Sequence, residues 1–419
     1  MVALPFPQCQ ATVGVLAVTR LNVISVTARA GSGPGGWIIR KRRDIGSDAI
    51  DARSRTRRSR GDGRATIADV AARAGVGAIT VSRALRNPAQ VSATLRALID
   101  EAIRELNYVP DLHARALASS RTDVLAVLVP SLSHSVFTDV LRGIYDGVDG
   151  STLNVQLGNT RFDPAEEERL LSGFVRQRPS AIIVSGVDQT PASRRMLEEA
   201  GCPVVQIMDM THDPIQVVIG FRHREAGRRM TEHLIRQGYR RIAYISGWMG
   251  GRSLERLQGY QDALAAAGLS EPCRAHSLSK AELTALASRA DPGVPPFLEF
   301  SGPSLGREMF RRARELAPGL DAVFCNNDSL ALGVLFECQA QGIRVPQDMG
   351  IVGFNDLDFM DACHPSLSSV RTHRYRNGHA AVTAVQQMLQ GIYDGPRVVD
   401  LGVELMIRES SLRHGLDGA

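Results

Sequence analysis

The residues of this chain that could do chemistry are arranged for binding rather than for catalysis. Across 419 residues there is no GxGxxG motif that opens a helix, no P-loop and no nucleophile paired with a base. The six cysteines are scattered, and no metal-ligand spacing recurs. Two acids, Asp209 and Asp328, stand at the ends of predicted strands, where carboxylates can accept hydrogen bonds from ligand hydroxyl groups. We therefore expect a ligand-binding protein that is not an enzyme and that needs no cofactor or metal.

The stretch ATIADVAARAGVGAITVSRALRNP, residues 65–88, has the pattern of two short helices joined by a turn. Thr66 and Asp69 form a predicted capping pair at the start of the first helix. Gly75 ends that helix, because glycine adopts the left-handed conformation of a helix end at little cost. Residues 78–85 form the second helix, with Val81 filling the space between the two. This is typical of a helix-turn-helix, whose second helix enters the DNA major groove, although an ordinary αα-hairpin has the same local pattern.

A third amphipathic helix is predicted in VSATLRALIDEAIRELNYVP, residues 91–110. Ser92 is its expected N-cap. With the first two helices it would make a compact bundle spanning residues 64–110. Its apolar stripe comprises Leu95, Leu98, Ile99, Ala102, Ile103 and Leu106.

The segments on either side of this bundle differ from it in composition. Residues 1–63 are basic and contain the linker-like GSGPGG, so we expect disorder that either adds phosphate affinity or does nothing. Residues 111–123 are expected to be a hinge that folds only against DNA, with Leu117 as a minor-groove wedge; an ordinary linker is the alternative. A net charge of +5 and a pI of about 9.0 favour a polyanionic partner. No apolar run approaches transmembrane length, so no membrane partner is expected.

From Val124 onward, apolar strands alternate with amphipathic helices. VLAVLVP is a continuous apolar run typical of a buried parallel strand, and similar runs recur as AIIVSG, PVVQIMD, RIAYISG, PPFLEF, AVFCNND and MGIVGFND. Repeated βα units build doubly wound parallel sheets, and these are too many for one sheet. We expect residues 124–419 to form two such lobes, with a ligand cleft at the carboxyl ends of the strands.

Several motifs together resemble the LacI/GalR family of bacterial transcriptional repressors, from Thr66 to near the C-terminus. They are TIADVAARAGV…TVSRALRN, LNYVPD…ARALASSRT, VPSLSHSVF, AGCPVV, HLIRQGYRRIAYISG, NNDSLALG and VPQDMGIVGFND. PASRRMLEEAGCPVVQIMD is most similar to the gluconate-utilisation branch. The resemblance implies periplasmic-binding-protein-like lobes, a homodimer on a palindromic operator, and a sugar or sugar-acid effector, possibly gluconate. It also implies a cytoplasmic repressor. The alternative, a sugar-binding sensory or transport receptor, would require an export signal and no DNA reader.

The resemblance also implies which residues contact DNA. Ala78 and Ile79 can offer methyl contacts to thymine, and Arg83 can pair with guanine. Leu117 matches the family's minor-groove leucine. Gly77 replaces a usual serine or threonine, which puts one phosphate contact in doubt. The expected phosphate contacts are made by Thr66, Thr80, Ser82 and Asn87.

The effector residues follow from the same comparison. Asp328 matches the family acid that binds sugar hydroxyls, although it could instead cap the following helix. Leu254 stands where the family's effector arginine is expected, so Arg252 is our choice for an effector carboxylate, with Arg256 as the other nearby arginine; either could be a solvated loop charge. Phe221 could pack on a sugar face or belong to the core, and His134 replaces a common asparagine. The remaining expected effector residues are Ser133, Phe137 and Asp209.

Overall fold

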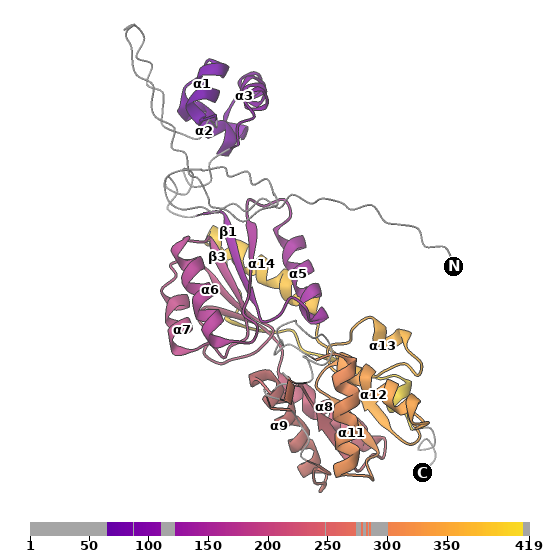
Figure 1. Cartoon of the computed structure of the whole chain (residues 1–419). Coiled ribbons are helices and arrows are strands. Elements are labelled where there is room, and N and C mark those ends of the chain that lie inside the picture. Colours follow the sequence, from indigo (N-terminus) through magenta and orange to yellow (C-terminus); the bar gives the residue numbers. More distant parts are fainter. Residues whose placement is uncertain are drawn as a thin grey trace, which may run out of the picture. The chain divides into compact units, whose positions relative to one another are not determined.

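The computed structural model describes residues 65–86, 88–109, 122–247, 249–273, 278, 279, 282, 283, 285 and 301–413. Residue contacts divide the chain into residues 1–64 and 65–419, so all described residues belong to the second unit. Its described parts are a three-helix headpiece and an α/β core (Figure 1). The expected hinge with Leu117, the expected strand PPFLEF and Asn87 lie outside the described residues.

The headpiece consists of α1 (Ile67–Ala74), α2 (Ala78–Arg86) and α3 (Ala93–Glu105), with a short 3-10 turn, η1 (Pro88–Gln90), between the last two. The predicted caps are confirmed. The Thr66 Oγ1 accepts a hydrogen bond from the Asp69 amide and donates one to the Asp69 carboxylate at 2.7 Å. Gly75 ends α1 at φ 67°, and the Ser92 Oγ accepts from the Leu95 amide at the start of α3.

Small side chains allow the three headpiece helices to pack closely. Val81 is completely buried, as predicted. Leu98 is 46% exposed, so its assignment to the buried stripe of α3 was wrong: the contact surface offered by α1 and α2 is narrow, and Ile99 and Ala102 fill it. The buried headpiece residues are Val70, Ala71, Val81, Ala84, Ile99 and Ala102.

The first lobe is built on a six-stranded parallel sheet in the order β10-β5-β4-β3-β1-β2. Its central strands are fully buried, which is why they read as unbroken apolar runs. The strands are β1 (Val124–Val129), β2 (Asn154–Asn159), β3 (Ala181–Ser185), β4 (Val204–Ile207), β5 (Val217–Gly220) and β10 (Val398–Asp400). Its helices are α5 (Ser135–Val148), α6 (Pro164–Arg176), α7 (Pro191–Glu198) and α14 (Arg374–Gln390).

The second lobe has a parallel sheet in the order β6-β7-β8, so the prediction of two parallel-sheet lobes is confirmed. Its strands are β6 (Ile242–Ile245), β7 (Ala322–Cys325) and β8 (Gly350–Val352). Beside them, β9 (Ser369–Arg371) and β11 (Glu404–Met406) pair antiparallel. The helices are α8 (His223–Arg236), α9 (Gly251–Ala266), α11 (Pro303–Leu316), α12 (Asp328–Ala340) and α13 (Phe359–Ala362), and the 3-10 turn η2 (Glu409–Ser411) follows β11.

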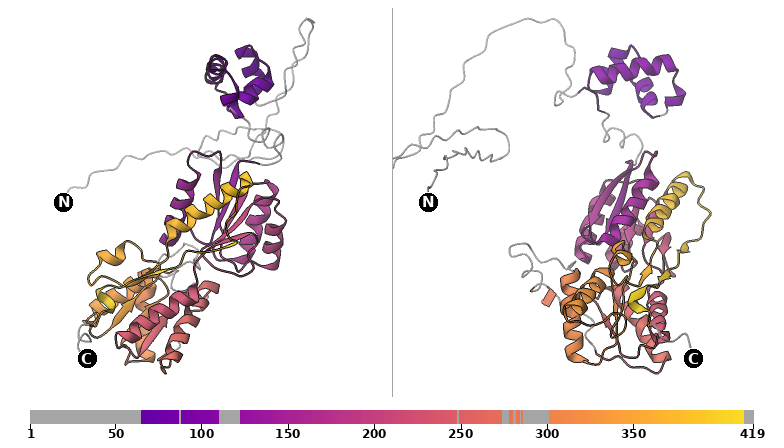
Figure 2. Two further views of the ribbon diagram at one scale, coloured as in Figure 1. Left: turned by 180° about the vertical axis from the view of Figure 1, so that it is seen from behind. Right: turned by 90° about the vertical axis from the view of Figure 1, so that its right-hand side faces the viewer.

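Helices α5 and α14 lie side by side although more than 200 residues separate them in sequence (Figures 1 and 2). Glycines on both helices explain the close approach. A Cβ on Gly143 would overlap the Tyr375 carbonyl oxygen, and one on Gly378 would overlap the Val140 carbonyl oxygen. The backbones therefore touch without intervening side chains, which fixes the chain's last long helix onto the first lobe.

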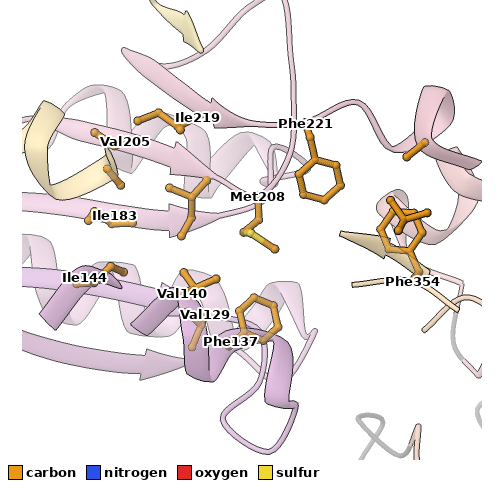
Figure 3. Packing of buried hydrophobic residues seen from close by; sticks show 14 of the residues in the cluster. Val129, Phe137, Val140, Ile144, Ile183, Val205, Met208, Ile219, Phe221 and Phe354 are labelled. Atoms are coloured by element: carbon orange, nitrogen blue, oxygen red, sulfur yellow. The ribbon is translucent and has the colours of Figure 1, made fainter. Parts of the chain in front are cut away.

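The main hydrophobic cluster runs from the first lobe into the second. Figure 3 shows Val129, Phe137, Met208 and Phe221 at the same ends of the first-lobe strands, with Phe354 of the second lobe beyond Phe221. The Phe221 and Phe354 ring centroids are 6.2 Å apart. After Phe221 the chain enters α8 of the second lobe, so the chain passes from the first lobe to the second at this strand end. The carboxyl ends of the strands are thus where residues of both lobes meet.

Candidate DNA-reading helix and effector site

The outer face of α2 presents the three residues predicted to read bases. Ala78, Ile79 and Arg83 are all exposed, and Ile79 is 76% exposed. Their helix is held from behind by Val81 and Ala84, which are buried against α1 and α3. The sequence of α2, AITVSRALR, has no acid that would repel phosphates. This arrangement leaves an apolar and cationic helix face free for a groove.

The predicted phosphate contacts are placed less uniformly. Thr80 and Ser82 are partly exposed on α2. The Thr66 hydroxyl is engaged in the capping box of α1, so in this conformation it serves the helix start rather than a free surface.

The effector residues predicted from sequence gather at the carboxyl ends of the strands. Ser133 and His134 follow β1, Asp209 follows β4, and Phe221 follows β5. Arg252 lies in the first turn of α9, after β6, and Asp328 follows β7. These positions come from both lobes, as expected for parallel sheets.

Arg252 connects the two lobes. Its Nη1 lies 3.4 Å from the Ser185 Oγ at the end of β3. Asp209 lies close enough for the Arg252 charge to act on it: burial raises the pKa of Asp209 to about 6, and Arg252 and the Met210 amide oppose that rise. The arginine therefore stands among first-lobe oxygens while belonging to a second-lobe helix. A guanidinium so placed can bind a carboxylate.

Acids surround this arginine. Burial raises the pKa of Glu167, and Asp188 and Glu168 add to the rise, while Arg252 opposes it. One Asp188 oxygen would lie 3.1 Å from a Cβ placed on Gly251, so Asp188 of the first lobe reaches the N-terminus of α9. The surroundings of Arg252 thus offer one strong donor and several acceptors, which suits a ligand rich in hydroxyl groups.

Asp328 is fully buried and committed to internal hydrogen bonds. Its oxygens accept from the Leu357 amide at 2.8 Å and from the Ser369 hydroxyl at 2.6 Å. Burial raises its pKa to about 6. The alternative that Asp328 caps α12 is wrong, because Asn327 is the N-cap and accepts from the Leu330 amide at 3.0 Å. Asp328 instead joins the turn after β8 to β9.

Three comparisons with known proteins agree with this geometry. Residues 66–111 match the model of bacterial regulatory proteins, lacI family. Residues 122–285 match the periplasmic binding proteins and sugar binding domain of the LacI family, and residues 231–411 match a periplasmic binding protein-like domain.

The relatives match over nearly their whole length. An HTH-type transcriptional regulator GntR from Pseudomonas aeruginosa is 37% identical over 84% of this chain and 97% of the relative. A GntR from Escherichia coli is 36% identical over 82% and 97%. A LacI family regulator structure from Silicibacter pomeroyi has a TM-score of 0.73 at 32% identity, covering 83% of this chain and 100% of that one. The chain belongs to the lacI family of bacterial regulatory proteins.

Membership establishes the general function. This lacI-family chain is a DNA-binding transcriptional regulator with a sugar-binding domain, and operator binding as a dimer is typical of the family. The relatives are transcriptional regulators rather than enzymes. Within the described part of the chain, no helix is both long and apolar enough to cross a membrane.

Some predicted effector residues of this regulator are placed differently from the expectation. Phe221 is fully buried against His223 and Phe354, which favours the core alternative over packing on a sugar face. Phe137 is likewise buried in the main cluster. The His134 ring lies beside the Phe162 ring, with centroids 5.9 Å apart. The backbone amide of His134 donates a hydrogen bond to the Ser131 hydroxyl.

Sequence reasoning undervalued Arg256. Arg252 and Arg256 both lie in α9, so neither is a solvated loop charge, and Arg256 is buried. Its Nη1 donates to the Asn326 carbonyl oxygen at 2.7 Å, and its guanidinium lies 3.8 Å above the Phe354 ring. The sequence did carry a signal for this burial, because Arg256 stands at helical spacing from the small or apolar residues Gly259, Tyr260 and Ala263. The structure buries all four on one face of α9.

Proposed function

We propose that this regulator represses sugar-acid utilisation genes and that its effector is gluconate or a similar aldonate. The observation that carries the proposal is Arg252, a second-lobe guanidinium placed beside Ser185 and Asp209 of the first lobe. A bidentate guanidinium recognises a carboxylate, and the surrounding acids accept hydrogen bonds from hydroxyl groups. Two relatives carrying the name GntR support the same branch.

The effector would act by binding both lobes at the carboxyl ends of their strands. Ser133, His134 and Asp209 would contact it from the first lobe, and Arg252 from the second. Asp328, Phe137 and Phe221 would support the site from behind, given their burial. The effector changes operator affinity only as far as it binds one lobe arrangement better than the other. Because a regulator must reach DNA inside the cell, we propose that the protein works in the cytoplasm.

On DNA, each subunit of a dimer would place α2 in one half-site of a palindromic operator. Ala78 and Ile79 would meet thymine methyl groups, and Arg83 would pair with guanine. Thr66, Thr80, Ser82 and Asn87 would contact phosphates, and Leu117 would enter the minor groove. The domain limits that we propose are residues 1–63, 64–110, 111–123 and 124–419.

Thermal unfolding of the full chain with a panel of sugars and sugar acids tests the effector. A ligand at about 100 times its dissociation constant adds roughly 2.7 kcal/mol if it binds only the folded state. We expect gluconate to raise the midpoint and glucose to leave it unchanged. A response to glucose but not to gluconate would contradict the choice of a sugar acid.

A neutral sugar is the second candidate, and one observation favours it. Three carboxyl groups, Glu167, Asp188 and Asp209, interact electrostatically with one another or with Arg252, so an incoming anion would meet several acids as well as the arginines. Acids that accept hydroxyl hydrogen bonds suit an uncharged sugar equally well. The panel separates the two candidates, because each glucose-type sugar is paired with its acid.

A further inference from the structure

His223 is a buried histidine that links the two lobes. It is the first residue of α8, at the crossover, and it is 3% exposed. Its Nε2 lies 3.0 Å from the Met208 carbonyl oxygen in the first lobe. Its Nδ1 lies 3.1 Å from the Nε of Arg256 in the second lobe. One ring therefore connects a first-lobe strand end to a second-lobe arginine.

The partners fix the protonation form of this ring. An arginine nitrogen can only donate, so the Nδ1 of His223 must accept the Arg256 hydrogen bond. A carbonyl oxygen can only accept, so the Nε2 must carry the proton that is donated to Met208. Burial, with the charges of Arg256 and Arg252, holds the pKa of His223 well below its usual range. The ring is thus a neutral connector with a defined tautomer.

Aromatic packing restrains the same ring. The Phe221 ring centroid is 4.4 Å away, and the Phe354 ring is stacked with a centroid distance of 6.0 Å. Phe354 also carries the Arg256 guanidinium on its face. Figure 3 shows Phe221 and Phe354 near each other at the end of the first-lobe strands. Rotation of the imidazole would disturb both hydrogen bonds and both ring contacts.

The first-lobe end of this connection has an unusual backbone. Met208 has φ 64°, in the left-handed region that costs free energy for a residue with a side chain. It directly precedes Asp209, whose backbone lies so close to Gly220 that a Cβ there would overlap it. The hydrogen bond from His223 stabilises this conformation and therefore the direction in which Asp209 leaves the strand.

We propose that His223 is a positioning residue for the effector site, acting through Arg256 on one side and through the Met208–Asp209 backbone on the other. It sets the distance between the first-lobe acid and the second-lobe arginines without touching the effector. A shift of one lobe on effector binding would therefore change the position of the other lobe's site residues through the His223 imidazole. This inference rests on the proposed function, because it assumes that an effector binds at these strand ends.

Two conservative variants separate the two hydrogen bonds. In His223→Asn, the amide oxygen can take the place of Nδ1 and accept from Arg256, while the donor to Met208 is lost. In His223→Gln, the amide nitrogen can take the place of Nε2 and donate to Met208, while the acceptor for Arg256 is lost. The matched control is His233→Asn, because His233 is also buried on α8 but bonds to the Ser411 hydroxyl, away from Arg256.

The measurement is gluconate affinity of the full-length variants by titration calorimetry, with the unfolding midpoint recorded for each. We expect His223→Gln to weaken binding about tenfold, the effect of losing one hydrogen bond to a charged group. His223→Asn keeps the acceptor for Arg256 but loses the donor to Met208, so it should weaken binding less than His223→Gln does and more than His233→Asn does. His233→Asn should bind within about twofold of the wild type even where its midpoint falls. In an Arg256→Lys background, His223→Gln should have little further effect, since the two residues act as one unit.

Equal affinity of wild type and His223→Gln would overturn the positioning role, as would equal losses in His223→Gln and His233→Asn. Additive losses in the Arg256→Lys background would also overturn it. If the wild-type protein binds no gluconate, the proposed effector fails instead, and the same variants are then compared with whichever sugar of the panel raises the wild-type midpoint.

Discussion

Arg252 and Ser185 belong to different lobes, yet the Arg252 Nη1 lies 3.4 Å from the Ser185 Oγ. The arginine comes from the first turn of α9 and the serine from the last residue of β3. A ligand between them would exchange this weak contact for a stronger one to its own oxygens. If the proposed function holds, the effector would bridge the two lobes at this pair.

Arg252→Ala should weaken gluconate binding by roughly 1.5–3 kcal/mol, the contribution of a hydrogen bond to a charged group. Leu254→Ala is the control, because Leu254 is 52% exposed on the same helix and should leave affinity unchanged. Calorimetric titration measures both. An unaffected Arg252 variant would remove this residue from the site and direct attention to Arg256.

Asp209→Asn should change how stability depends on pH. Because the folded pKa of Asp209 is raised from 3.8 to about 6, the native state binds more protons than the unfolded state between about pH 4 and 6. The stability contributed by this proton is complete below pH 4 and is lost as pH rises through 6. Asparagine cannot ionise and can still accept from the Met210 amide.

The Asp209→Asn variant should therefore be more stable than the wild type by roughly 2–3 kcal/mol at pH 7.5, with the difference shrinking toward pH 4. Urea unfolding at several pH values without effector measures it, and replacement of the exposed Asp149 by asparagine is the control. A constant difference across the pH range would contradict the burial of an ionised Asp209.

Arg83→Ala should relax base preference at one operator position and cost about 1–3 kcal/mol there. Arg73→Ala is the charge-matched control, since Arg73 lies on α1 and pairs with Glu105 at 2.5 Å. Binding to operators substituted one base pair at a time distinguishes them. If Arg83→Ala weakened binding equally to all operator sequences, Arg83 would contact phosphate rather than a base.

Leu117→Ala should reduce operator bending and affinity, because a wedge side chain that unstacks a base step would be missing. Leu117 lies outside the described residues, so this prediction depends on the sequence alone. Circularly permuted operator fragments report the bend. If Leu117→Ala left the operator curvature unchanged, residues 111–123 would be an ordinary linker.

Gly143→Ala should destabilise the first lobe by about 1–3 kcal/mol, because the added methyl group overlaps the Tyr375 carbonyl oxygen. Gly173→Ala in α6 is the control: nothing lies within 4 Å of its Cβ position, and alanine is the better helix former, so stability should rise. Denaturant unfolding measures the stability of both variants. If Gly143→Ala were as stable as Gly173→Ala, the close packing of α5 on α14 would be contradicted.

Local signals predicted much of the fold. The caps at Thr66 and Ser92 and the helix end at Gly75 depend on neighbouring residues only, and all three are confirmed. Buried parallel strands such as β1 were visible because both faces are covered. The short strands β9, β10 and β11 carry no such run, since each has three residues and pairs with a distant segment.

The sequence by itself determined the helix-turn-helix, the alternation of strands and helices, and the family to which they belong, because these are set by local spacing and by motifs. Only the tertiary structure decided which polar residues are free to meet a ligand. It buried Asp328 in bonds to Leu357 and Ser369, and it joined His223 to Met208 and Arg256. These partners lie 15 to 41 residues apart in sequence, and only chain folding brings them together.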